Sequence, residues 1–228
     1  YRHCVTPQPW ISSCRCARLF HMYGSRSSSV SWHRLTSGAP SLALRASLVS
    51  AVVAPPHPLY GGHLSNPVVT ALREGLARRG VGVLAFNWRG VGASGGRPSG
   101  DASIALADYA AALAYMKASA PSPLPWVAAG YSFGAATALA IAASDPSVGE
   151  VVVVAPPVAM LPHDISFAAP DCRVTVVAAA FDDFSPLEEL RRAFARIDGA
   201  RIVTVAGADH FFSSGRLDVI AEAAAVGA

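Results

Sequence analysis

Residues 130–134 read Gly-Tyr-Ser-Phe-Gly, a spacing that can hold a nucleophilic serine in a tight turn. The segment follows an apolar run at 125–130 and opens an Ala-rich stretch at 133–143. Glycines on both sides of Ser132 lack a Cβ, so a strand and a helix can approach closely around it. The Ser132 hydroxyl would then stand at the end of the strand, where the first N–H groups of the helix favour a developing negative charge. An ordinary turn serine is the alternative, because Gly, Ser and Ala are abundant in this chain.

A serine hydroxyl becomes an effective nucleophile when a base accepts its proton. The two histidines that follow Ser132 are His163 and His210. In a sheet with such a turn, the acid and the histidine come later in the chain, each after a further strand. His210 follows the apolar run at 201–206, whereas His163 lies in a Pro-rich segment. The sequence therefore predicts His210 as the base.

The acid of this arrangement is expected after the apolar run at 173–179, where two carboxylates are adjacent. Asp182 is predicted to accept a hydrogen bond from the imidazole, fix its tautomer and stabilise the imidazolium. Asp183 is the alternative acid and is better placed to interact with the start of the next helix. Asp209 directly precedes His210 and is expected to shape that loop. Together, Ser132, His210 and Asp182 predict acyl transfer through a covalent intermediate.

The elements that must position these residues are visible in the pattern of apolar residues. Near-continuous apolar runs are typical of parallel strands buried on both faces. They occur at 47–54, 81–87, 125–130, 150–155, 173–179 and 201–206. Stretches predicted to be helical occupy 65–79, 102–118, 133–143, 186–197 and 214–226. This alternation predicts one α/β domain over 43–228, with a doubly wound, mostly parallel sheet and right-handed crossovers.

With these motifs, the chain resembles the small uncapped α/β hydrolases, a group of serine hydrolases of unassigned substrate. The resemblance covers residues 50–226, and the order Ser, Asp, His is the family's. It is carried by HPLYGG at 57–62, FNWRGVGAS at 86–94, GYSFG at 130–134, FDD at 181–183 and GADHFF at 207–212. It implies an α/β-hydrolase fold with about six strands, and it favours Asp182 as the acid. No lid domain is expected, because the Pro-rich stretch 156–172 leaves no room for a helical lid.

The resemblance also places part of an oxyanion hole in the segment at 57–62. Pro58 has no N–H to donate. The predicted backbone donors are therefore Leu59, with Tyr60 as the alternative, and Phe133, which follows the nucleophile. His57 is expected to brace the loop by hydrogen bonding.

The site is expected to be open and bordered by apolar side chains. Tyr60, Met160 and Phe211 are the predicted substrate contacts, although packing within the loops is an equal alternative. Leu59, Phe133 and Leu161 would complete the border. Such a rim suits a small-molecule acyl substrate, either an ester or a thioester. A non-catalytic binding module and a serine peptidase on the same fold are the alternatives.

Other patterns in the chain do not predict a cofactor or a metal. Residues 90–95 match GxGxxG, but Gly96, Pro98 and Gly100 prevent the helix that a dinucleotide site needs. The Cys-Arg-Cys sequence at 14–16 lacks a second pair of ligands. We therefore expect no cofactor and no metal site.

The charge distribution sets the N-terminal segment apart from the rest of the chain. The formal charge of +3 arises from arginines that precede the first acidic residue, Glu74, which is poor evidence for a nucleic-acid partner. Residues 1–36 are rich in Arg and Ser and are expected to be a disordered transit-like or non-native leader. We expect an intracellular, soluble protein without a membrane span, located in a mitochondrion or plastid if the leader is a transit peptide. The oligomeric state stays open.

Overall fold

The computed structural model describes residues 50–119, 125–160 and 172–226. The predicted leader, the beginning of the first predicted strand at 47–49, Leu161 and His163 lie outside these ranges.

Six strands form one parallel sheet in the order β2-β1-β3-β4-β5-β6. The strands are β1 Ser50–Ala54, β2 Gly82–Ala85, β3 Trp126–Tyr131, β4 Val148–Val154, β5 Arg173–Phe181 and β6 Arg201–Asp209. The central strands are buried on both sides, as their continuous apolar runs predict. The predicted parallel sheet of about six strands is thus confirmed.

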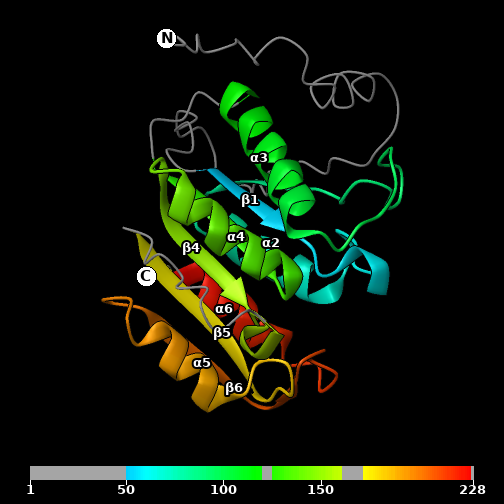
Figure 1. The fold of residues 1–228 in the computed structure, drawn as a ribbon. Helices are drawn as coiled ribbons and strands as arrows, with labels where there is room; N and C mark the ends of the chain where they lie inside the picture. The colour runs from blue at the N-terminus through cyan, green and yellow to red at the C-terminus, as the bar shows by residue number, and fades with distance from the viewer. Residues whose placement is uncertain (1–49, 120–124, 161–171, 227–228) are drawn as a thin grey trace, which may run out of the picture.

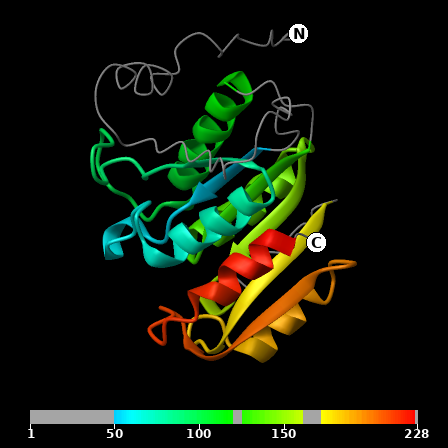
Figure 2. The same cartoon turned by 180° about the vertical axis from the view of Figure 1, so that it is seen from behind.

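Helices cover both faces of this sheet. In Figure 1, α3 Ala102–Ser119, α4 Phe133–Ser144 and α5 Leu187–Phe194 lie on the near face. Figure 2 shows α2 Pro67–Arg78 and α6 Leu217–Val226 on the opposite face. Each face has its own apolar cluster, because alternate side chains of every strand point to opposite sides.

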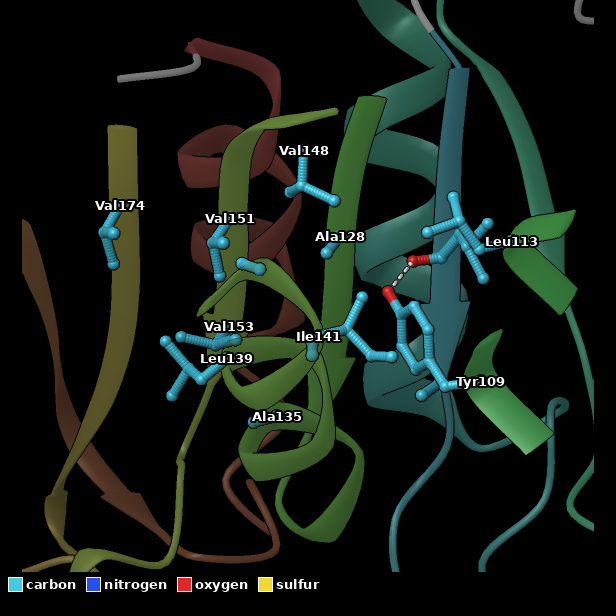
Figure 3. Packing of buried hydrophobic residues seen from close by; sticks show 14 of the residues in the cluster. Tyr109, Leu113, Ala128, Ala135, Leu139, Ile141, Val148, Val151, Val153 and Val174 are labelled. Atoms are coloured by element: carbon cyan, nitrogen blue, oxygen red, sulfur yellow. Dashed lines mark hydrogen bonds between the residues drawn. The ribbon is translucent and has the colours of Figure 1, made fainter. Parts of the chain in front are cut away.

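The cluster beneath α3 and α4 also contains a buried polar group. Figure 3 shows Tyr109 of α3 with its hydroxyl directed at β1. This hydroxyl donates to the carbonyl of Val52 at 2.7 Å and accepts the N–H of Ala129 at 2.9 Å. The bonds fasten α3 to the junction of β1 and β3.

That junction is where the direction of winding changes. From β1 the chain passes through α2 to β2 on one face, and it returns through α3 to β3 on the other. The carboxyl ends of β1 and β3 therefore border the crevice in which open α/β sheets bind ligands. Two short 3-10 helices follow strands on this edge, η1 Pro58–Tyr60 after β1 and η2 Val158–Met160 after β4.

The observed elements differ from the predicted ones mainly at their ends. The helix predicted over 214–226 begins at Leu217, because Gly215 has a φ of 77° and cannot continue a right-handed helix. The strand predicted over 201–206 continues to Asp209, through Gly207 with a φ of 74°. No helix begins at the GxGxxG pattern of residues 90–95; the next described helix, α3, starts at Ala102.

A buried ion pair ties the amino-terminal end of the sheet to its helices. Glu150 of β4 is 1% exposed, and Arg79 at the end of α2 binds both of its carboxylate oxygens, at 2.7 and 2.6 Å. Arg173 lies 3.4 Å from the same carboxylate. Removing the principal partner of a buried charge is costly, since the charge stays desolvated.

We expect Arg79→Met to lower the free energy of unfolding by about 3 kcal/mol. The exposed pair of Arg191 with Glu188 provides the matched control, and Arg191→Met should cost less than about 1 kcal/mol. Urea unfolding followed by circular dichroism measures both values. Equal losses in the two variants would contradict the structural role of the Arg79–Glu150 pair.

Candidate active site

Ser132, His210 and Asp182 come together at the carboxyl edge of the sheet, although the acid lies 50 positions and the histidine 78 positions after the serine. Ser132 follows β3, Asp182 follows β5 and His210 follows β6. The Ser132 Oγ lies 3.0 Å from His210 Nε2. On the other side of the ring, Nδ1 lies 2.8 Å from Asp182 Oδ2 and 2.9 Å from Oδ1. All three side chains are buried.

The turn that presents Ser132 is strained and closely packed. Ser132 has φ 54° and ψ −117°, a conformation that costs about 1–3 kcal/mol for a residue with a side chain. A Cβ on Gly130 would come within 2.3 Å of the carbonyl oxygen of Gly134. A Cβ on Gly134 would meet the carbonyl oxygens of Ala54 and Pro55 at 2.5 Å. The two glycines are therefore required by close backbone approaches on both sides of the serine.

An irregularity between β5 and β6 sets the acid beside the histidine. Ala179 pairs with Val205, but the next pair is Phe181 with Asp209, so β6 contributes two more residues than β5 over this interval. The shift places Phe181 level with Asp209, and the residues that follow them are Asp182 and His210. Without it, the imidazole and the carboxylate would leave the sheet at different levels.

Asp182 is held in place by hydrogen bonds from its own loop. Its Oδ1 accepts the backbone N–H groups of Phe184 and Ser185, both at 2.9 Å. A carboxylate can only accept hydrogen bonds. Nδ1 of His210 therefore carries the proton, and Nε2 presents its lone pair to Ser132. The alternative acid, Asp183, is exposed.

Asp209 has a different role, as the sequence predicts. Its Oδ1 accepts the N–H of Ser213 at 2.9 Å and so shapes the turn after β6. Hydrogen bonds from the backbone and hydroxyl of Ser213 lower the pKa of Asp209, so this carboxylate stays ionised.

Tyr131 contributes a contact that sequence reasoning missed. Its hydroxyl donates to the main-chain carbonyl of His210 at 2.8 Å, and its ring lies against the imidazole, 5.9 Å between centroids. Burial, and then the charges of Asp182 and Asp209, raise the pKa of Tyr131, so the phenol keeps its proton and acts as a donor. Tyr131 thus links the nucleophile turn to the histidine loop. No local pattern in the sequence signals this contact, because the two residues lie 79 positions apart.

In the turn after β1, the backbone N–H groups expected to be oxyanion donors already make hydrogen bonds. His57 braces this turn, as predicted: its Nδ1 accepts the N–H of Leu59 at 3.2 Å, and its carbonyl accepts that of Tyr60 at 3.1 Å. Burial lowers the pKa of His57, which favours the neutral ring that can accept this bond. The predicted donor Leu59 and its alternative Tyr60 are therefore both engaged within the turn.

Two other N–H groups at this edge remain available. The N–H of Phe133, at the start of α4, and that of His57 make no hydrogen bond to the described part of the chain. The ring of His57 lies 4.7 Å from that of Phe133, so the two residues are neighbours across the crevice.

The structure describes some of the side chains predicted to border the site. Leu59, Tyr60 and Phe211 are exposed beside the site. Met160 belongs to η2, but its side chain lies outside the described part of the structure, as does Leu161. Phe184, which sequence reasoning did not single out, packs against both His210 and Phe211. Between β4 and β5, the described residues include no helix except the short η2.

Known proteins agree with this architecture. A family described as "Serine aminopeptidase, S33" matches residues 61–197. An α/β serine hydrolase homologue from Coxiella burnetii is 29% identical and superposes with a TM-score of 0.75, covering 86% of this chain and 89% of that chain. A lidless α/β serine hydrolase from Xanthomonas campestris is 26% identical with a TM-score of 0.68, covering 81% and 82%. An uncharacterized protein of Rickettsia prowazekii is 30% identical over 171 residues, 71% of each chain. The fold is that of the α/β hydrolases.

Two other kinds of feature are absent from the described residues. Within the described ranges, no group of three or more His, Cys, Asp or Glu side chains could hold a metal ion. No described helix is long and apolar enough to cross a membrane.

The role of Tyr131 can be separated from that of a second buried tyrosine, Tyr109. We expect Tyr131→Phe and Tyr109→Phe each to cost about 1–2 kcal/mol of unfolding free energy, because each leaves buried backbone groups without a partner. Only Tyr131→Phe should increase hydrogen–deuterium exchange in residues 207–213, since it releases the His210 carbonyl. Equal exchange of this segment in both variants would argue against the link between Tyr131 and the histidine loop.

Proposed function

Since the chain belongs to the serine aminopeptidase S33 family of α/β hydrolases, we propose that it is a serine hydrolase that cleaves a carboxylic ester or thioester through an acyl-enzyme on Ser132. One observation carries this proposal: a continuous line of hydrogen bonds from Ser132 Oγ through both nitrogens of His210 to Asp182. Such a line activates a serine in acyl-transfer enzymes on several unrelated folds.

In the first step, Ser132 Oγ attacks the substrate carbonyl carbon while Nε2 of His210 accepts the hydroxyl proton. The resulting imidazolium is stabilised by Asp182, which is already aligned with Nδ1 and does not itself take the proton. The strained backbone at Ser132 keeps its hydroxyl at the end of β3, where the helix α4 begins.

The carbonyl oxygen becomes negatively charged in this step and needs hydrogen-bond donors. The N–H of Phe133 is one donor in our proposal, because it opens α4 and has no acceptor among the described groups. For the second donor, Leu59 would have to give up its bond to His57 Nδ1, whereas the His57 N–H is available. We therefore favour the N–H of His57, with Leu59 as the alternative. Each donor in such a hole typically contributes about 3 kcal/mol to transition-state stability.

The tetrahedral intermediate collapses when its bond to the leaving oxygen or sulfur breaks and Nε2 of His210 donates its proton to that atom. Water then attacks the acyl-enzyme, again with His210 as base, and the carboxylic acid and Ser132 are released. No redox partner or metal enters this sequence.

A peptide bond could be cleaved by the same groups, and the family description names aminopeptidases. No described side chain distinguishes an amine-binding subsite, so we favour the ester or thioester. A non-catalytic binding module is disfavoured, because such a module has no need to keep all three groups buried and aligned at hydrogen-bond distance.

Covalent labelling tests the proposal. We expect an alkyl fluorophosphonate to modify the folded protein once, at Ser132, as located by mass spectrometry of its peptides. Ser132→Ala should abolish labelling, and Asp182→Asn should reduce kcat on a reactive ester by about 10⁴-fold, because the imidazole is then held in the wrong tautomer. Ser144→Ala, at the exposed end of α4, is the matched control and should label like the wild type.

The outcome that contradicts this function is specific. Folded wild-type protein that stays unlabelled, while a known serine hydrolase in the same tube is labelled, would exclude an activated Ser132. Labelling without turnover on esters, thioesters or peptides would favour the binding module instead.

A further inference from the structure

Large exposed apolar side chains gather at the carboxyl edge of the sheet. In the described part of the chain these are Leu59, Tyr60, Phe181, Phe184, Phe211 and Val226. Val226 lies at the end of α6 and Phe181 ends β5, whereas the other four lie in the loops that follow β1, β5 and β6. Exposed apolar side chains concentrated in this way mark a binding surface.

Two of these side chains line the histidine side of the site. We call Phe184 and Phe211 the aromatic wall; their exposed fractions are 39% and 66%. The ring of Phe184 lies 4.8 Å from the His210 imidazole, and that of Phe211 lies 5.4 Å from it, edge to face. Because Tyr131 occupies the buried side of the imidazole, Phe184 and Phe211 border the side that faces solvent.

The chemistry of acyl transfer indicates which part of the substrate lies beside this wall, namely the leaving group. The carbonyl oxygen must lie at the N–H of Phe133, at the start of α4. The leaving oxygen or sulfur must instead lie within reach of Nε2 of His210, which gives it a proton. The leaving group therefore extends along the side of the imidazole that Phe184 and Phe211 border.

The charged side chains in the loops after β5 and β6 are all acidic. Residues 181–185 and 207–215 contain Asp182, Asp183 and Asp209 but no Lys or Arg. Asp183 is exposed, and hydrogen bonds from Ser213 keep Asp209 ionised. The nearest arginine along the chain, Arg216, lies 3.5 Å from Asp218. An anion on the leaving group would meet the negative charges of Asp183 and Asp209 here.

We propose that the leaving group of the substrate is an apolar alcohol or thiol without negative charge, and that the aromatic wall and Asp183 with Asp209 select for it. This inference rests on the proposed function and narrows it. Carriers that bear phosphates, which many cellular thioesters use, are disfavoured, and neutral or cationic alcohols and thiols are accepted.

A charge series with constant reactivity tests the electrostatic part. The substrates are butyrate esters of benzyl alcohol, 4-carboxybenzyl alcohol and 4-(aminomethyl)benzyl alcohol, which differ mainly in charge. At low ionic strength we expect kcat/KM for the carboxybenzyl ester to be roughly tenfold below that for the benzyl ester, and the gap to shrink with added salt. The aminomethyl ester should be at least as good as the benzyl ester.

Variants locate the source of this selectivity. Asp183→Asn with Asp209→Asn should bring the anionic and neutral esters to within about twofold, and the asparagine at 209 can still accept the Ser213 N–H. Glu74→Gln, an exposed acid on α2, is the matched control and should leave the gap unchanged. Phe211→Ala should lower the ratio of benzyl to ethyl butyrate cleavage by roughly fivefold, whereas Val226→Ala should not alter it.

The results separate this inference from the function on which it rests. Equal cleavage of the anionic and neutral esters by the wild type, or an undiminished gap in the Asp183→Asn and Asp209→Asn double variant, would overturn the charge selection. An unchanged benzyl-to-ethyl ratio in Phe211→Ala would overturn the role of the wall. Failure to cleave any ester, together with no fluorophosphonate labelling, would instead remove the proposed function itself.

Discussion

The close approach of β3, α4 and the end of β1 around Ser132 is the constraint on which the rest of the site depends. Carbonyl oxygens lie where a Cβ of Gly130 or Gly134 would stand, and Ser132 itself adopts a positive φ. Such a conformation persists only where the surrounding structure enforces it. The two apolar clusters, one on each face of the sheet, supply that enforcement.

The second half of the site depends on a different device, the irregular pairing of β5 with β6. The shift between Ala179 and Phe181 brings the acid and the histidine out of the sheet side by side. Loop hydrogen bonds then fix Asp182, and the Tyr131 hydroxyl fixes the backbone of His210. The imidazole is thereby held in place by three contacts, which come from its own loop, from the acid and from the nucleophile turn. Its solvent-facing side is left to the aromatic side chains that we assign to the leaving group.

Much of this arrangement can be predicted from the sequence, because its signals are local. Apolar runs predicted the strands, and the serine motif between a strand and a helix predicted the turn. The features that the sequence does not predict depend mainly on tertiary contacts. The bond from Tyr131 to His210 joins residues 79 positions apart, and no pattern around Tyr131 encodes it. The pairing shift between β5 and β6 likewise depends on two strands that meet only in the fold. The bond from the Leu59 N–H to His57 is local instead and depends on the turn that η1 forms.

In the proposed site, the imidazole of His210 is a fixed, oriented link between Ser132 and Asp182. Nuclear magnetic resonance of protein labelled with ¹⁵N in its histidine rings tests it most directly. We expect neutral His210 to carry its proton on Nδ1, with a slowly exchanging, low-field proton resonance that disappears in Asp182→Asn. A His210 ring protonated on Nε2, or one that averages between tautomers as an exposed histidine does, would rule out this oriented link.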